Sequence, residues 1–209
     1  MRSPYFNVPT EGHLKVTNKL IEDHPLKKME IVDAVLKSWE QIFVSKIGPL
    51  SIGIDIFPSP QVMSNILHEL IPYNLAALVG NDVRIGKSKN EKDIEYLPNP
   101  DFSIEVKTSS HNTDIFANRS YAQPSFNSGT KNKNGYYIAV NIEKFDLDED
   151  GIEIKAKFDE KGSLVYPKIR KIRFGYLEHN DWIAQNAATG QQARLTPAAK
   201  RTKLLQIYP

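Results

Sequence analysis

The sequence predicts an α/β protein, and two observations lead to this fold class. Between residues 25 and 79, apolar side chains recur at every third or fourth position, which is typical of amphipathic helices. Further along, short segments either alternate between apolar and polar residues or run continuously apolar, which is typical of strands. With 209 residues, 40% of them hydrophobic, the chain is expected to form a single domain over residues 1–209 with a sizeable core.

The composition limits the classes of function and location. The chain has no cysteine, which excludes disulfides, thiolate metal sites and a cysteine nucleophile. Its beginning lacks the apolar core of a signal peptide, and no apolar run reaches membrane-spanning length, so we expect a cytoplasmic protein without membrane association. The net charge of +2 does not by itself indicate nucleic-acid binding. Basic residues nevertheless concentrate at 168–173 and 194–203, where they can contact phosphates.

The first part of the chain predicts two helices. Residues 1–24 show no clear periodicity, and we expect them to wrap the surface as a peripheral N-terminal segment. Residues 25–44 predict an amphipathic helix with Trp39 in the core. Ser59 has the properties of an N-cap, with proline at the first helical position. The helix that it starts is expected to resume after Pro72 and to end near residue 79.

The next segment predicts two short strands joined by a tight turn. The first strand covers roughly residues 93–97, and residues 98–101 (PNPD) have strong turn chemistry. The second strand, residues 102–108, alternates strictly between apolar and polar side chains. Its polar face carries Glu105 and Lys107, whose Cα atoms are then about 6–7 Å apart.

The polar face of this hairpin has the composition of a metal-dependent hydrolytic site. Two carboxylates can hold Mg²⁺, which neutralises a scissile phosphate and lowers the pKa of its bound water. A lysine beside them can contact both the phosphate and the attacking water. The hairpin returns Asp93 to the neighbourhood of Glu105 and Lys107, provided that the connection has an odd length or contains a bulge. The alternative is a surface hairpin with a solvated, salt-bridged face.

The tripeptide at residues 105–107 (EVK) resembles the second half of the PD-(D/E)XK nuclease signature. The literal Pro-Asp dipeptide ends at Asp101, four residues before Glu105. On a straight strand that spacing is about 13 Å, which is too far for one ion whose ligands lie at about 2.0–2.1 Å. We therefore predict Asp93, Glu105 and Lys107 as catalytic residues, with Asp93 and Glu105 as the metal ligands.

An acidic residue on the preceding helix is a further candidate. In many nucleases that carry this signature, such a residue joins the catalytic site, and Glu69 is placed accordingly. The alternative is an exposed helical glutamate. The neighbouring His68 is interpreted as a surface or hydrogen-bonded histidine rather than a metal ligand.

Two segments are unusually rich in Asn, Gln, Arg and Ser, the residue types that contact base edges and phosphates. One covers residues 109–124 and the other residues 183–195. Base contact is one explanation, and a polar loop is the other. The candidates for DNA binding are Ser109, Asn112, Asn118, Arg119, Gln123 and Gln191.

The rest of the chain predicts strands. Residues 135–145 are apolar enough for a central strand. Residues 152–158 and 168–176 predict further strands, and residues 204–208 a last short one.

Most of the chain, from about residue 25 to residue 208, resembles the ScaI-type restriction endonucleases. The stretches that carry the resemblance are DIFPSPQVMSNILHELIP, IEVKTSSHNTDIFANRSYAQPS, NGYYIAVNIEKF and IRFGYLEHNDWIAQNAATGQQARL. The resemblance implies a restriction-endonuclease-like mixed β-sheet core flanked by helices. It also implies a homodimer, a Mg²⁺ cofactor, a short palindromic target in double-stranded DNA, and a functionally paired DNA methyltransferase. Members of the family cut AGTACT to blunt ends, and the products would carry 5′-phosphates.

Two other functions fit parts of this pattern. A structure-selective or repair endonuclease could use the same core, and its cleavage would depend on DNA shape. A DNA-binding module that has lost catalysis is a second alternative. The complete carboxylate–carboxylate–lysine set argues against that module, because an inactive site has no need to hold those charges together.

Overall fold

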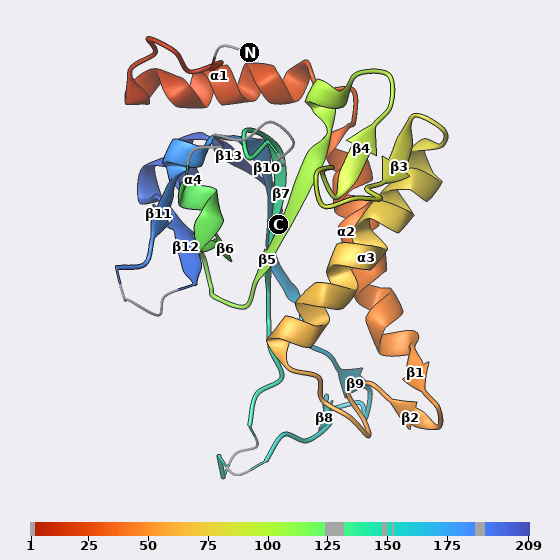
Figure 1. Ribbon diagram of the computed structural model, residues 1–209. Coiled ribbons are helices and arrows are strands. Elements are labelled where there is room, and N and C mark those ends of the chain that lie inside the picture. The colour runs from red at the N-terminus through yellow and green to blue at the C-terminus, as the bar shows by residue number, and fades with distance from the viewer. Residues whose placement is uncertain (1–2, 124–131, 148–149, 152, 187–190) are drawn as a thin grey trace.

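A mixed six-stranded sheet forms the centre of the computed structural model (Figure 1). Helices cover one face of this sheet, and a second, three-stranded sheet covers the other. The predicted α/β class, with a mixed sheet flanked by helices, is confirmed. The structure describes residues 3–123, 132–147, 150–151, 153–186 and 191–209.

The main sheet has the order β13-β10-β7-β5-β4-β3. Its strands are β3 (Val83–Ile85), β4 (Ile94–Tyr96), β5 (Ile104–Ser109), β7 (Gly135–Ile142), β10 (Ile169–Leu177) and β13 (Leu204–Tyr208). Strands β5 and β7 run parallel, and the other neighbours are antiparallel. Every residue of β7 is buried, as predicted for a central strand.

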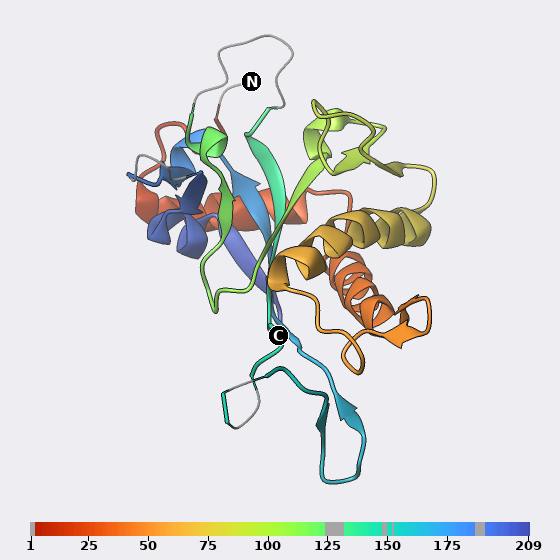
Figure 2. The ribbon, with the colours of Figure 1, turned by 60° about the horizontal axis from the view of Figure 1, so that its bottom comes forward.

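Two further groups of strands complete the β-structure. The small sheet has the order β11-β12-β6 and contains β6 (Phe116–Asn118), β11 (Trp182–Ala184) and β12 (Gln192–Leu195). Two hairpins extend from the body, formed by β1 (Lys46–Ile47) with β2 (Leu50–Ser51) and by β8 (Lys157–Phe158) with β9 (Leu164–Val165) (Figures 1 and 2). The strand predicted over 152–158 is thus reduced to β8, and residue 152 lies outside the described residues.

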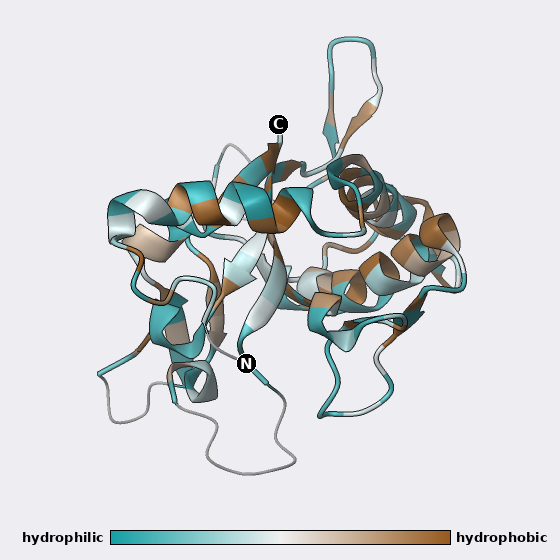
Figure 3. Ribbon diagram, turned by 90° about the horizontal axis from the view of Figure 1, so that it is seen from above, coloured by the Kyte–Doolittle hydropathy of each residue, from teal (hydrophilic) through white to brown (hydrophobic). Residues whose placement is uncertain are grey.

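The helices are α1 (Thr10–Glu22), α2 (Lys28–Val44), α3 (Pro60–Val79) and α4 (Pro197–Thr202). Short 3₁₀ turns occur at η1 (Pro100–Phe102), η2 (Arg119–Ala122) and η3 (His179–Asp181). Hydrophilic and hydrophobic residues alternate along the long helices (Figure 3), as expected where one helix face packs on the protein and the other faces water. None of the helices in these ranges is long and apolar enough to cross a membrane.

Helices α2 and α3 pack on the same face of the main sheet (Figure 1). Trp39 is buried as predicted, and its indole N–H donates to the Pro167 carbonyl at 2.7 Å. Helix α3 runs through Pro72 without interruption. The fully buried Ile71 and Leu75 lie on either side of the proline, and their packing explains why the helix continues where the proline removes one backbone hydrogen bond.

The N-terminal segment contains a helix that the sequence pattern does not predict. Only Thr17 and Ile21 of α1 are buried, and Leu20 packs partly buried against the main core. Polar contacts add to this small apolar contact. The Thr17 hydroxyl donates to the Thr202 carbonyl at 2.7 Å, and it lies 2.9 Å from the Tyr5 hydroxyl. Helix α1 therefore lies across one end of the sheet without a large apolar contact (Figure 1).

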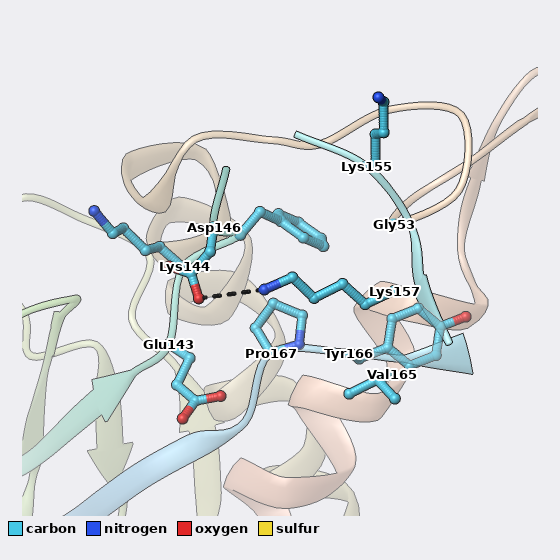
Figure 4. Close-up of a pocket in the computed structure, with 10 residues that line it drawn as sticks. Gly53, Glu143, Lys144, Asp146, Lys155, Lys157, Val165, Tyr166 and Pro167 are labelled. Atoms are coloured by element: carbon cyan, nitrogen blue, oxygen red, sulfur yellow. Dashed lines mark ion pairs between the residues drawn. The ribbon is translucent and has the colours of Figure 1, made fainter. Parts of the chain in front are cut away.

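A small cavity of about 130 Å³ lies beside the β8–β9 hairpin (Figure 4). Its charged side chains include Lys157, whose Nζ lies 3.8 Å from the Asp146 carboxylate. Gly53 forms part of the wall, and a Cβ at that position would meet the Tyr166 ring at 2.9 Å. None of the predicted site residues lines this cavity.

His24 is a buried, neutral histidine where α1 passes into α2. The Leu26 N–H donates to its Nδ1 at 3.1 Å, so the neutral ring carries its proton on Nε2 and donates to the Phe102 carbonyl at 3.1 Å. The rings of Phe102, Tyr136 and Phe174 surround it at centroid distances of 5.2, 4.4 and 5.0 Å. Burial in this aromatic pocket lowers the pKa of His24 from 6.5 to about 4.

The stability of the fold is expected to fall as His24 becomes protonated. Its pKa is lower in the folded state than in the unfolded chain, so the stabilisation is complete above about pH 6.5 and is lost as the pH falls toward 4. Urea unfolding at a series of pH values should show a loss of about 2–3 kcal/mol from this group. His24→Gln should lack this component. An identical pH dependence in the two proteins would contradict the assignment.

Candidate active site

The connection between β4 and β5 is fixed by side chains of the hairpin itself. The Ser103 hydroxyl accepts from the Tyr96 N–H at 3.0 Å and donates to Glu95 Oε2 at 3.0 Å. The Asn99 side chain accepts from the Asp101 N–H, which starts the 3₁₀ turn η1. The predicted second strand is therefore shorter at its beginning, and Asp101 lies on an exposed turn.

Asp93 lies directly before β4 and beside β5. Ile94 pairs with Ile104 across residues 95–103, a connection of odd length, so Asp93 returns next to Glu105 as expected. This is the only residue pair between the two strands, so β4 does not extend to the N–H of Val106. That N–H donates instead to Asp93 Oδ2 at 2.7 Å. The carboxylate is thereby fixed to the backbone of β5.

Glu105 and Lys107 lie two positions apart on β5 and form a buried ion pair. Their side chains are 2% and 12% exposed, and Lys107 Nζ lies 2.7 Å from Glu105 Oε1. The ammonium also donates to the Val106 carbonyl at 3.1 Å. Glu105 pairs in register with Tyr137, so both side chains point to the face that the small sheet covers. Glu105 and Lys107 are thus protected from solvent, and the alternative of a solvated, salt-bridged surface hairpin does not apply.

Tyr121 makes a further contact with this pair, which the sequence pattern does not predict. Its hydroxyl donates to Glu105 Oε1 at 2.5 Å, and Lys107 Nζ lies 4.7 Å from its ring centroid. Burial, followed by the nearby charge of Glu105, raises the pKa of Tyr121 far above its usual value of 10, so the phenol stays a proton donor. Tyr121 lies within a segment noted for its polar side chains. Tyr121 lies on a 3₁₀ turn, and the number of residues between this turn and β5 does not predict that the two come into contact.

Helix α3 brings His68, rather than Glu69, against the hairpin. His68 Nδ1 lies 3.7 Å from Asp93 Oδ2, whereas the Glu69 side chain is exposed. The helix turns by about 100° per residue. Because Leu67 and Ile71 are fixed in the core, His68 faces the hairpin edge and Glu69 faces solvent.

The oxygens in this region match the preferences of a small divalent cation. The described ranges contain no cluster of three or more His, Asp and Glu side chains arranged as a metal site. A cationic group nevertheless already lies between two oxygens, because the Lys107 ammonium contacts both Glu105 Oε1 and the Val106 carbonyl. The Asp93 carboxylate accepts from the Val106 N–H. The carboxylates of Asp93 and Glu105 and the Val106 carbonyl are therefore candidate metal ligands. Such oxygen ligands, completed by water, suit Mg²⁺.

The two polar segments of the sequence come together in the small sheet. Asn118 of β6 pairs with Gln192 of β12, and the Arg119 N–H donates to the Gln191 carbonyl at 2.7 Å. Asn118, Gln123 and Gln191 have exposed side chains. Positions 124 and 187–190 lie outside the described residues. Segments predicted separately are thus parts of one polar surface.

A buried polar network anchors the loop between β5 and β6. Asn141 is fully buried, and its amide group donates to the carbonyls of His111 at 2.7 Å and Asp114 at 3.1 Å. The Arg173 guanidinium donates to the Asn141 amide oxygen at 2.8 Å. Asn112 is exposed on this loop. Ser109 is buried, and its hydroxyl accepts from the His111 N–H at 3.1 Å.

Several cations of the two basic stretches are engaged within the protein. Arg173 is buried in the network just described, and Lys203 is buried against Glu178 and Asp181. Lys200 binds the Asp114 carboxylate and lowers the pKa of that group. The Arg194 side chain is 54% exposed. Arg194 is thus more exposed than the two buried cations, although its Nη1 lies 4.0 Å from Asp114 Oδ2.

Comparison with known proteins gives two matches that extend over nearly the whole chain. A family model described as ScaI restriction endonuclease matches residues 3–208. The type II restriction enzyme ScaI of Streptomyces caespitosus is 44% identical over 208 residues, which cover 99% of this chain and 85% of that protein. Both matches include the β4–β5 hairpin and the two polar segments.

Replacing Asn141 with alanine should destabilise the fold by about 2–3 kcal/mol. The change removes the amide donor of two loop carbonyls and the closer acceptor of the buried Arg173 guanidinium, which keeps only a 3.4 Å contact with the Thr113 carbonyl among those described. Chemical denaturation followed by circular dichroism measures the effect. Asn118→Ala, at an exposed position, should change the free energy of unfolding by less than about 0.5 kcal/mol. Equal effects for the two variants would contradict the anchoring role of Asn141.

Proposed function

Because the chain belongs to the ScaI restriction endonuclease family, we propose that Asp93, Glu105 and Lys107 form its catalytic centre. The protein is a type II restriction endonuclease, which hydrolyses DNA at specific sites. The observation that carries the proposal is the Asp93 carboxylate bound to the β5 backbone, directly beside the buried Glu105–Lys107 pair. The exposed position of Glu69 favours its interpretation as a surface residue.

Type II restriction endonucleases use a divalent metal ion, and we propose Mg²⁺ as the ion for this enzyme. Asp93 and Glu105 would hold it, together with the Val106 carbonyl, because these oxygens lie along one edge of β5. When bound, the ion neutralises charge on the scissile phosphate and lowers the pKa of a bound water.

The protein side chains have separate roles in this proposal. The Val106 N–H holds one Asp93 oxygen at 2.7 Å and so fixes the orientation of that carboxylate. Lys107 is a compact cation at the end of a flexible stem, and it donates to the phosphate and to the attacking water. In the protein alone its ammonium is held by Glu105. Binding of phosphate and metal would replace that contact.

We further propose that double-stranded DNA binds across the small sheet and the β5–β6 loop. Five of the predicted contacts are suitably exposed or lie at the rim of this surface, namely Asn112, Asn118, Arg119, Gln123 and Gln191. Ser109 is buried and holds the loop, so it is less suited to base contact. A side chain that bonds a base edge at two points contributes about 1–3 kcal/mol of discrimination.

We also propose a palindromic target and a homodimer, which the family resemblance implies. Each protomer would meet an identical half-site, and the two catalytic centres would cut the two strands. The proposed target is AGTACT, cut to blunt ends that carry 5′-phosphates. A paired DNA methyltransferase would protect the same sequence in the host, and both proteins would act in the cytoplasm. Family membership favours this site-specific function over a structure-selective nuclease and over an inactive DNA-binding module.

Digestion of unmethylated phage DNA tests the proposed target. In the presence of Mg²⁺ we expect discrete fragments whose sequenced ends all derive from AGTACT, and in EDTA we expect none. A different palindrome would refute the target and leave the enzyme class unchanged. Fragments whose ends share no sequence would contradict site-specific cleavage.

Substitution of the proposed catalytic residues tests the centre itself. Lys107→Ala and Glu105→Gln should each lower the cleavage rate by about 100–1,000-fold or more, because each removes charge stabilisation at the reacting phosphate. Binding to the target duplex, measured in Ca²⁺, should persist. Lys161→Ala, at an exposed position, is the matched control and should cleave like the wild type. Cleavage at the wild-type rate by either catalytic variant would show that the assignment is wrong.

A further inference from the structure

Tyr121 contacts the proposed catalytic pair without belonging to it. Its hydroxyl donates to Glu105 Oε1 at 2.5 Å, and this oxygen also accepts from Lys107 Nζ at 2.7 Å. The Lys107 ammonium lies over the Tyr121 ring, 4.7 Å from its centroid. Because the phenol and the ammonium share one oxygen, rotation of the Glu105 carboxylate would break both contacts. The phenol thus constrains the orientation of Glu105 and the location of Lys107.

The backbone of Tyr121 belongs to the polar surface rather than to the main sheet. It lies on η2, which directly follows β6, and the Arg119 N–H at the start of η2 donates to the Gln191 carbonyl. The Tyr121 ring packs on Trp182 of β11 at a centroid distance of 5.6 Å. On the other side of η2, Lys133 Nζ donates to the Ser120 carbonyl. The backbone of this turn is therefore held at Arg119 and Ser120, and its Tyr121 ring is held by β11.

We propose that Tyr121 is a positioning residue that makes the geometry of the Glu105–Lys107 pair depend on the placement of the small sheet. This inference rests on the proposed function, in which that sheet binds DNA. When the small sheet binds the duplex, it fixes the position of the Tyr121 hydroxyl. The hydroxyl in turn orients the Glu105 carboxylate, the proposed metal ligand. The hydroxyl needs no change of protonation for this role, because it acts throughout as a hydrogen-bond donor.

A purely structural role for the hydroxyl is the competing explanation. A buried carboxylate requires hydrogen-bond donors, and Tyr121 could serve only to satisfy Glu105. Loss of the hydroxyl would then lower stability, and cleavage of the folded enzyme would be unaffected. The two explanations therefore differ in the cleavage rate of a stable variant with normal DNA affinity.

Tyr121→Phe retains the ring and removes the donor. We expect its single-turnover cleavage of the target duplex at saturating Mg²⁺ to be about 10–100-fold slower, the usual effect of losing a partner of a metal-holding side chain. Its affinity for the duplex in Ca²⁺ should stay within twofold of the wild type. Tyr136→Phe is the matched control, since it removes a buried hydroxyl that donates to the Leu20 carbonyl on the opposite face of the sheet. This control should cleave within twofold of the wild type.

Proton NMR of the wild-type protein without metal provides a second test that does not depend on activity. The hydroxyl proton of Tyr121 should be protected from exchange and shifted downfield, and it should move in Glu105→Gln. Absence of this signal would overturn the proposal, even if Tyr121→Phe proved unstable. Wild-type cleavage by a folded Tyr121→Phe variant, or a parallel loss of DNA affinity, would also overturn it. If the wild type itself did not cleave, the proposed function would fail, and the NMR result would still decide the contact.

Discussion

The burial of the Glu105 carboxylate is the constraint on which the arrangement around it depends. A charged group that is 2% exposed is stable only where donors replace the water that it has lost. Lys107 comes from the same strand, but Tyr121 comes from a turn of the second sheet. The layer formed by β6, β11 and β12 therefore does more than cover apolar surface. It also supplies a hydrogen-bond donor to the buried carboxylate of β5.

The second requirement is an incomplete strand next to β5. If β4 extended further along β5, a backbone carbonyl would accept from the Val106 N–H, and Asp93 would have no such site. The single Ile94–Ile104 pair leaves this donor to the Asp93 side chain. The short strand thus has a chemical consequence, because it allows a carboxylate to approach the Glu105–Lys107 pair along the sheet edge.

The sequence predicts those parts of the molecule whose pattern of residues lies within one short segment. Helices α2 and α3 have an apolar stripe, and the β4–β5 hairpin has alternation and turn residues, so the placement of Asp93 beside Glu105 follows from an odd connection. Helix α1 is not predicted, and only two of its residues, Thr17 and Ile21, are buried. Glu69 and His68 differ by one helical position, and only the packing of the neighbouring Leu67 decides which of them faces Asp93. The contact of Tyr121 depends on pairing between distant segments, which no local pattern reveals.

The path of the chain connects the proposed catalytic and DNA-binding groups. From Glu105 on β5 the chain leaves the sheet, passes Asn112 on the loop, forms β6 and returns to Glu105 through the Tyr121 hydroxyl. Both ends of this excursion are held, one by the β5–β7 pairing and the other by the β6–β12 pairing. The loop between them is anchored by Asn141. In the proposed coupling, a displacement of the polar surface would reach the Glu105 carboxylate through the Tyr121 hydroxyl.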